Sequence, residues 1–194
     1  IFINNILDIF VMKKIFLYTF FLSIVLAKPT FGFNQSNSWN KSNNFNYDSL
    51  YFESITLIEK DEVSKSIKIL IDITADSKDK GLVLNSYYDL AQIYLSRSSD
   101  YEKSIEYFQF IFNNSFSYKL NSKSKLRSFL ELKEKSLFMI GYIYHNHIGN
   151  LTKAQKYYNL FLNDYPNSDL VSSVTYELEI INELINQFNE QTKK

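Results

Sequence analysis

The two histidines are the residues whose type and spacing come closest to a chemical site. His145 and His147 are separated by one residue, and imidazole nitrogens are common metal ligands. On a helix, residues two positions apart point to different faces, so both rings could not hold the same ion. No third ligand stands at a suitable spacing, and the chain contains no cysteine. We therefore predict no metal site.

Acid–base and phosphate chemistry also lack a supporting pattern. Asp and Glu are scattered in a way typical of solvated helix faces, without a pair of carboxylates placed for catalysis. A glycine-rich phosphate loop is missing as well. We predict no catalytic residues and no cofactor, and hence a protein that is not an enzyme.

The amino-acid composition limits which fold classes and which kinds of partner we expect for this chain. The chain has 194 residues, with 21 Lys and Arg against 21 Asp and Glu, and this balance gives no electrostatic footprint for nucleic acid. Basic residues gather at 119–127 and at Lys133 and Lys135, but they alternate with Ser and Leu as solvated faces do. Four Gly and two Pro allow few tight turns, which argues against an all-β fold.

One pattern occurs twice with a constant offset of 50 positions. Each copy has a large apolar residue, then Leu or Ile followed by a small residue, then Tyr, then a small and an aromatic residue four apart. The first copy is Tyr87, Leu90, Ala91, Tyr94, Ser104 and Phe108, and the second is Leu137, Ile140, Gly141, Tyr144, Ala154 and Tyr158. Pro166 closes the second copy.

The small residues in this pattern have a physical meaning. Two helices approach closely only where side chains are small, so we expect the helices to cross at Ala91 with Ser104 and at Gly141 with Ala154. A glycine inside a helix costs roughly 1 kcal/mol relative to alanine, so Gly141 indicates close packing. An ordinary helical hairpin with a chance glycine is the alternative.

The order of residues resembles the tetratricopeptide repeat. The resemblance implies an all-α solenoid of helical hairpins that binds a protein or peptide, and it leaves the partner unnamed. Residues 65–70 align with 103–108 and 153–158, which adds a degenerate first repeat. Asn167, Ser168 and Asp169 could cap a final helix over the end of the stack. The predicted repeat domain spans 48–190, with repeats at about 48–76, 84–117 and 134–167 and a capping helix at 169–190.

Two departures from the family pattern have structural consequences. The offset of 50 exceeds the usual period of about 34, so roughly 16 extra residues lie between Asn113 and Lys135. They either extend the helices or form a protruding loop. The small residues of each clear repeat are also thirteen positions apart where the family has twelve, which predicts longer turns at 97–100 and 147–150.

The resemblance also implies a binding surface. In the family the first helix of each repeat lines the concave face, so residues offset from the packing positions face a groove. Aromatic side chains with a few polar groups suit peptide capture, although Tyr88, Phe138 and Tyr142 could equally pack against neighbouring helices. Carried over by position, the groove residues are Asn85, Tyr88, Gln92, Leu95, Lys135, Phe138, Tyr142 and His145.

The N-terminal residues predict export. Met12, Lys13 and Lys14 precede thirteen uncharged residues that end at Ala27, as in a secretory signal. Residues 1–32 are therefore predicted to be an upstream extension and a signal peptide, with Met12 as the start and cleavage after Ala27 or Gly32. An uncleaved inner-membrane anchor is the alternative, although thirteen residues are short for a span of about 20.

A polar stretch without periodicity follows at 33–47, and we predict a flexible linker rich in Asn and Ser. Without cysteine the product would have neither a disulfide nor the acylated residue of a bacterial lipoprotein. We therefore expect a periplasmic protein that reaches a membrane only through partners or through an uncleaved leader.

The end of the third repeat, 160–168, is similar to the repeat endings of bacterial envelope proteins. Two groups of envelope proteins have such endings. One is the periplasmic tetratricopeptide proteins associated with the Tol-Pal system, and the other is the repeat lipoproteins of the β-barrel assembly machinery. The missing lipoprotein cysteine disfavours the second group. We predict an exported adaptor for protein–protein interactions in envelope assembly or maintenance, the alternative being a non-catalytic structural subunit anchored in the inner membrane.

Overall fold

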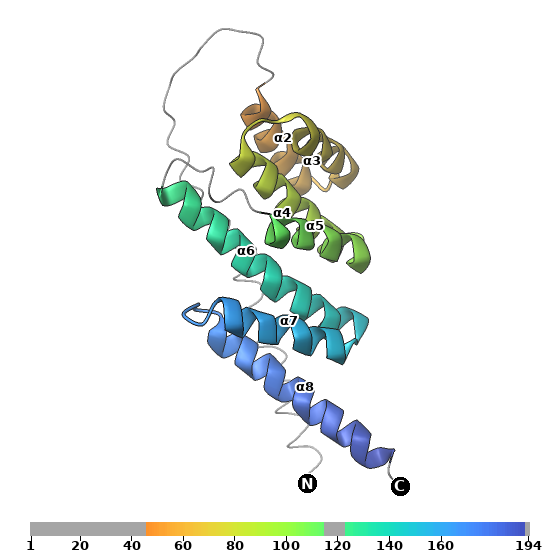
Figure 1. The fold of residues 1–194 in the computed structure, drawn as a ribbon. Helices are drawn as coiled ribbons and strands as arrows, with labels where there is room; N and C mark the ends of the chain where they lie inside the picture. Colours follow the sequence, from red (N-terminus) through yellow and green to blue (C-terminus); the bar gives the residue numbers. More distant parts are fainter. Residues whose placement is uncertain (1–45, 115–122, 193–194) are drawn as a thin grey trace. The chain divides into compact units, whose positions relative to one another are not determined.

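A computed structural model describes residues 46–114 and 123–192, which are helical and contain no strand (Figure 1). The predicted leader and nearly all of the predicted linker lie outside these residues. The all-α fold of helical hairpins with a final capping helix is confirmed. The helices are α2 (Tyr47–Glu59), α3 (Val63–Asp76), α4 (Lys80–Ser96), α5 (Tyr101–Asn113), α6 (Lys123–Ile143), the π-helix η2 (Tyr144–Ile148), α7 (Leu151–Asp164) and α8 (Val171–Gln191).

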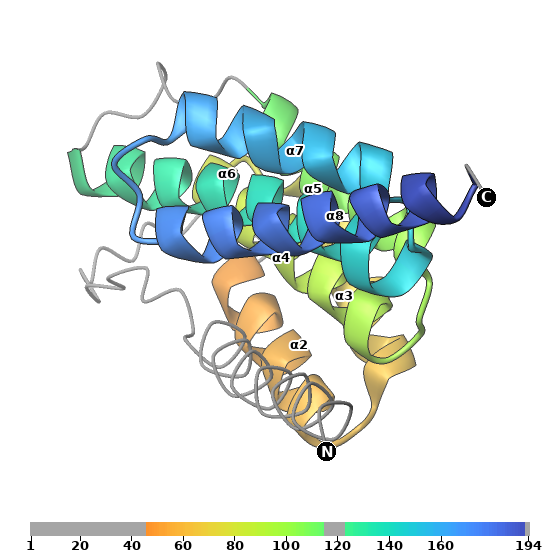
Figure 2. The same ribbon diagram turned by 90° about the horizontal axis from the view of Figure 1, so that it is seen from below.

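Consecutive helices pack against each other along the whole stack. The pairs α2 with α3, α4 with α5, and α6 with α7 form three hairpins, and α8 packs on α7. The first helices of the hairpins also touch, α2 with α4 and α4 with α6. Figure 2 shows α6, α7 and α8 running beside one another at the C-terminal end of the stack. No helix within the described ranges is long and apolar enough to cross a membrane.

Short polar side chains begin four of the described helices. At each such N-cap the side chain accepts a hydrogen bond from a backbone N–H of the first turn, which has no partner inside the helix. The residues that do so are Asn46 for α2, Asp79 for α4, Asp100 for α5 and Asn150 for α7.

The capping helix begins differently from the prediction. Its N-cap is Leu170, which makes no side-chain hydrogen bond, so Asn167, Ser168 and Asp169 do not cap it directly. Ser168 Oγ instead accepts from the N–H of Leu170 at 2.9 Å and donates to Glu134 of α6. The hydroxyl therefore fixes the loop before α8 to α6.

The predicted close packing of the two helices is present in both clear repeats, at Ala91 with Ser104 and at Gly141. In the second repeat, the buried Ser104 Oγ donates to the carbonyl oxygen of Ala91 at 2.8 Å. In the third, a Cβ on Gly141 would lie 2.7 Å from two ring atoms of Tyr158. The prediction of close packing at Gly141 is correct, and the neighbour that requires it is the ring of Tyr158.

The extra residue of each clear repeat lies where the two helices meet. In the second repeat Ser99 takes a positive φ of 51°, and in the third Gly149 takes 73°. The N–H of Asp100 donates to the carbonyl of Tyr94, and that of Asn150 to Tyr144, again 50 positions apart. In the third repeat, part of the predicted turn at 147–150 is the π-helix η2, whose wider turn accommodates an extra residue.

The first repeat has its own pair of small residues. Ser54 and Ser66 are both fully buried, and they stand at the usual spacing of twelve positions. The turn between α2 and α3 is correspondingly shorter, with Asp61 at φ 64° and Glu62 donating to the carbonyl of Leu57. The degenerate first repeat therefore also has small, buried residues in both of its helices, as the other two repeats do.

Part of the predicted insertion extends a helix. Because α6 begins at Lys123, the insertion's second half lengthens the first helix of the third repeat. Lys133 Nζ donates to the carbonyl of Asn114 at 3.0 Å and lies over the rings of Phe112 and Phe129. Burial lowers the pKa of Lys133. This lysine ties the long α6 to the end of α5.

Candidate partner-binding surface

The predicted groove residues of α4 mostly pack inside the stack. Tyr88 is buried, and its ring meets that of Phe108 edge to face with the centroids 5.6 Å apart. Burial raises the pKa of Tyr88 to about 12. Asn85 and Leu95 are buried as well, and only Gln92 is partly exposed. For Tyr88, the structure therefore shows the packing that was the alternative to a groove.

Asn85 is the polar exception in this packed face. Its side chain is 8% exposed, and its Oδ1 has no hydrogen-bond partner among the described residues. An unpaired buried carbonyl costs about 1–3 kcal/mol. A ligand could reach this oxygen only after its neighbours moved, and the side-chain nitrogen of Gln92 is also buried without a hydrogen-bond partner in the part of the chain that the structure describes.

The predicted groove residues of α6 share one face of the helix. Phe138 is buried, and its ring packs near those of Tyr158 and Phe161, at 5.9 and 6.4 Å between centroids. Lys135, Tyr142 and His145 keep partly exposed side chains. Spacings of three and four residues place these four on a common stripe of α6 and η2, which we call the α6 stripe.

His145 at the end of the α6 stripe is held by the capping helix. Its Nδ1 lies 2.6 Å from Oε2 of Glu177 on α8, and the two side chains are 10% and 2% exposed. Burial raises the pKa of the neighbouring Tyr158 well above its usual value, and the charge of Glu177 adds to the shift. Sequence reasoning missed Glu177, although its spacing of three residues from Val174 and four from Ile181 places it on the buried side of α8, unlike the exposed Glu179.

The two histidines face different parts of the stack. The ring of His147 stacks on Tyr101 of α5 with centroids 4.7 Å apart, while that of His145 meets α8. Burial lowers the pKa of His147. Across residues 46–114 and 123–192, no three His, Cys, Asp or Glu side chains come together as a metal site would require.

A second, partly buried pair connects the first two repeats. Tyr51 of α2 donates to Oδ2 of Asp89 on α4 at 2.6 Å. Burial raises the pKa of Asp89 to about 6, and the hydrogen bond from Tyr51 partly offsets that rise. Burial also raises the pKa of Tyr51. Both groups are occupied with each other, which makes the pair a structural link.

A small open pocket of about 300 Å³ lies apart from the α6 stripe, between α5 and the corner where η2 meets α7. Within its lining, Lys153 Nζ sits 4.9 Å from the ring centroid of Tyr144, and Gln109 donates to the hydroxyl of Tyr157. These contacts already engage much of its polar lining. The lining residues are Glu102, Ile105, Glu106, Gln109, Tyr144, Ile148, Asn150 and Lys153.

Comparison with known families agrees with this architecture. Residues 135–168, which hold the C-terminal part of α6 from Lys135 to Ile143, η2 and all of α7, match the tetratricopeptide repeat. No curated protein and no solved structure matches the chain. The repeat match and the stack of helical hairpins together support a tetratricopeptide-repeat protein, a class that generally binds proteins or peptides without catalysis.

Proposed function

We propose that this chain is an exported adaptor that binds a segment of another protein along the α6 stripe, in cell-envelope assembly or maintenance. The repeat fold supports the binding role, since stacked hairpins present an extended surface to a partner. Export is supported by the charged start at Met12 to Lys14 and by the thirteen uncharged residues that follow.

The composition and exposure of the α6 stripe carry the binding proposal. Lys135 offers a cation at one end and Tyr142 an aromatic face in the middle, both partly exposed, while His145 at the other end is only 10% exposed and is held by Glu177. The buried Phe138 packs beside Tyr142, with the two ring centroids 6.4 Å apart. A rigid aromatic with polar groups on either side is typical of surfaces that bind peptides.

Residues 160–168 resemble the repeat endings of the Tol-Pal-associated proteins, and this likeness suggests which partners to test first. We propose Tol-Pal components as the first candidate partners, and the β-barrel assembly machinery as the second. An anchored structural subunit is the competing function, and it differs in one observable property, because it would keep residues 12–27 in the mature protein.

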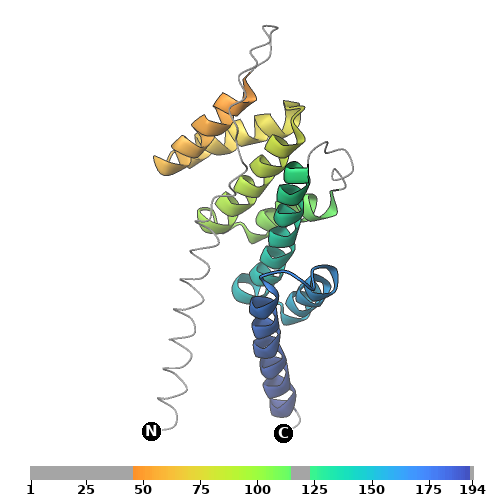
Figure 3. The same ribbon diagram turned by 90° about the vertical axis from the view of Figure 1, so that its left-hand side faces the viewer.

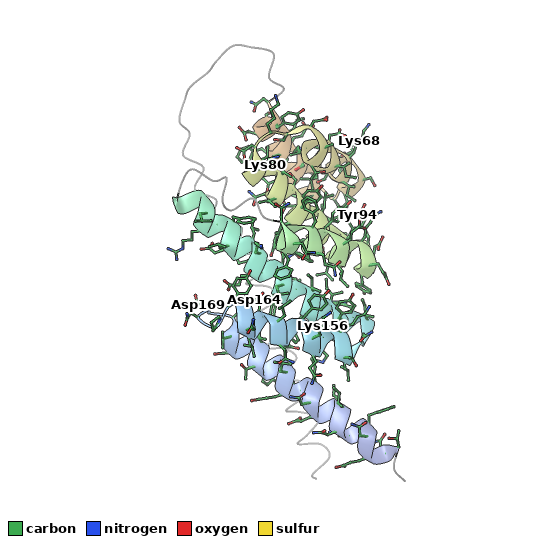
Figure 4. The ribbon with its side chains drawn as sticks, in the orientation of Figure 1. Lys68, Lys80, Tyr94, Lys156, Asp164 and Asp169 are labelled. Carbon is green, nitrogen blue, oxygen red and sulfur yellow. The ribbon has the colours of Figure 1, made fainter. Side chains whose placement is uncertain are left out.

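The test uses a C-terminally tagged full chain in its native cell, with fractionation, sequencing of the mature N-terminus and quantitative affinity capture. Three proteins are compared: the wild type, the double variant Lys135→Glu with Tyr142→Ala, and the control Lys156→Glu. Lys156 is an exposed lysine of α7, the second helix of the hairpin (Figure 4). We expect a periplasmic product trimmed near Ala27 or Gly32, and an envelope partner that only the double variant loses.

Other outcomes would contradict parts of the proposal. A protein that stays in the cytosol would refute export, and an intact leader with inner-membrane partners would favour the anchored subunit. If the double variant and Lys156→Glu recover every partner equally, the α6 stripe is not the binding surface.

A further inference from the structure

The open pocket between α5 and the corner of η2 and α7 combines apolar side chains with two carboxylates. Its volume is about 300 Å³, and its lining includes Ile105, which is buried, and Ile148, which is 38% exposed. Glu102 stands three residues before Ile105 and four before Glu106, so all three lie on one side of α5. The pocket shares no residue with the α6 stripe.

The pocket lies where two consecutive repeats meet. Figures 1 and 3 both show the hairpin of α4 and α5 beside the hairpin of α6 and α7. One wall of the pocket comes from α5, and the other comes from η2 and the start of α7. An occupant would therefore contact both repeats at once.

Both glutamates of the pocket lack a partner within the described residues. Lys153, on the other wall, lies over the ring of Tyr144. Across 46–114 and 123–192, neither Glu102 nor Glu106 forms an ion pair or accepts a hydrogen bond. Both side chains are exposed. The pocket thus has two unpaired negative charges against the single positive charge of Lys153.

These features together define the chemistry of an occupant. One that covers Ile148 and neutralises the glutamates needs an apolar stem that ends in a cation, as in lysine and arginine side chains. Arginine suits two carboxylates on successive turns better, because its guanidinium offers five N–H donors in a planar fork, whereas an ammonium is a compact point charge. Because the pocket is open, a free small molecule would bury less than the roughly 70–90% usual for bound ligands, which favours an arginine carried by a larger partner.

We propose that this pocket binds an arginine side chain of another protein, with its methylene groups on Ile148 and its guanidinium between Glu102 and Glu106. A second copy of this chain is disfavoured as the source, because Arg97 and Arg127 already pair with carboxylates of their own chain. The contact is separate from the α6 stripe and does not depend on export.

Two short synthetic peptides test the proposal. They are identical except at the central residue, which is arginine in one and its neutral isostere citrulline in the other. Titrations of the full chain, followed by NMR of isotope-labelled isoleucine methyl groups, should show the arginine peptide binding at least about fivefold more tightly. The methyl signals of Ile105 and Ile148 should shift most.

Matched variants locate the binding site. Glu102→Gln with Glu106→Gln should reduce the preference for the arginine peptide to about twofold or less. The control Glu179→Gln with Glu183→Gln removes two exposed charges from α8 and should leave the preference unchanged. Lys153→Gln should raise the affinity for the arginine peptide about twofold, because it removes the cation in the pocket.

Several outcomes would overturn the proposal. They are equal binding of the two peptides, equal losses in the two double variants, and no binding at all. N-acetylarginine amide should bind more weakly than the arginine peptide, and equally tight binding would make a free guanidinium compound the occupant instead. A dimer of the wild type that Glu102→Gln with Glu106→Gln dissociates would also contradict it, because a second copy would then supply the arginine.

Discussion

At the scale of single residues, Gly141 shows how one missing side chain allows a helix crossing. A Cβ at this position would meet two ring atoms of the fully buried Tyr158 at 2.7 Å. The ring of Tyr158 has little room to move, since it also packs near Phe138. The glycine is therefore required by packing, although glycine is a poor helix former.

We expect Gly141→Ala to lower the free energy of unfolding by about 1–3 kcal/mol, because the strain of overpacking exceeds the gain in helix propensity. Urea denaturation measures this difference. In a double-mutant cycle with Tyr158→Leu, the two losses should be less than additive, since the smaller side chain makes room for the methyl group. A Gly141→Ala protein more stable than the wild type would show that no close contact exists here.

Asp89 makes stability depend on pH. Its folded pKa of about 6 lies above the usual 3.8, so the folded state binds the proton more tightly. Protonated Asp89 stabilises the fold fully below pH 4, and that contribution is lost as the pH rises through 6. Asp89→Asn cannot ionise and should gain roughly 2 kcal/mol relative to the wild type between pH 4 and pH 7.5.

Denaturation of both proteins at several pH values gives this difference directly. The exposed Asp72→Asn corrects for the general effect of removing an acidic group from the chain. Parallel stability curves for Asp89→Asn and the wild type would mean that the carboxyl of Asp89 is not perturbed by burial.

At the scale of elements, the attachment of α8 rests on one buried polar pair within an apolar contact. Glu177 is 2% exposed and bound to His145, while Val174 and Ile181 next to it are fully buried. Removing one member of a buried pair leaves the other unpaired, and the loss then exceeds what the intact pair contributed. Glu177 thus connects the capping helix to the end of the α6 stripe.

We expect Glu177→Ala to destabilise the protein by about 3 kcal/mol and to increase hydrogen exchange in α8 before the other helices. The matched control is Glu179→Ala, two residues away and exposed, with an expected change within about 0.5 kcal/mol. Similar losses in the two variants would show that the buried pair does not hold α8.

At the scale of the whole molecule, helical periodicity and the 50-residue offset were enough to predict the fold class and the crossing at Ala91 and Ser104. The same offset relates Lys103 over Tyr94 to Lys153 over Tyr144, so a full comparison of the two copies would have found these contacts too. Ser54 could have been found from its twelve-residue spacing to Ser66.

Other features depend on contacts that a sequence pattern does not record. Tyr88 and Phe138 stand at groove positions of the family, but each ring packs on the second helix of its own hairpin, where a large apolar surface is more stable. The pairing of His145 with Glu177 joins residues 32 positions apart. The π-helix follows from how one extra residue is accommodated, which residue type alone does not decide.

The most direct test of the central claim, that the α6 stripe binds a partner, is photo-crosslinking in the native cell. A photoreactive phenylalanine analogue replaces Tyr142 in one variant and Lys156 in a matched one, both at side chains with solvent access. We predict a crosslink to one envelope protein from position 142 and none to that protein from position 156. The same products from both positions, or none from position 142, would contradict the account.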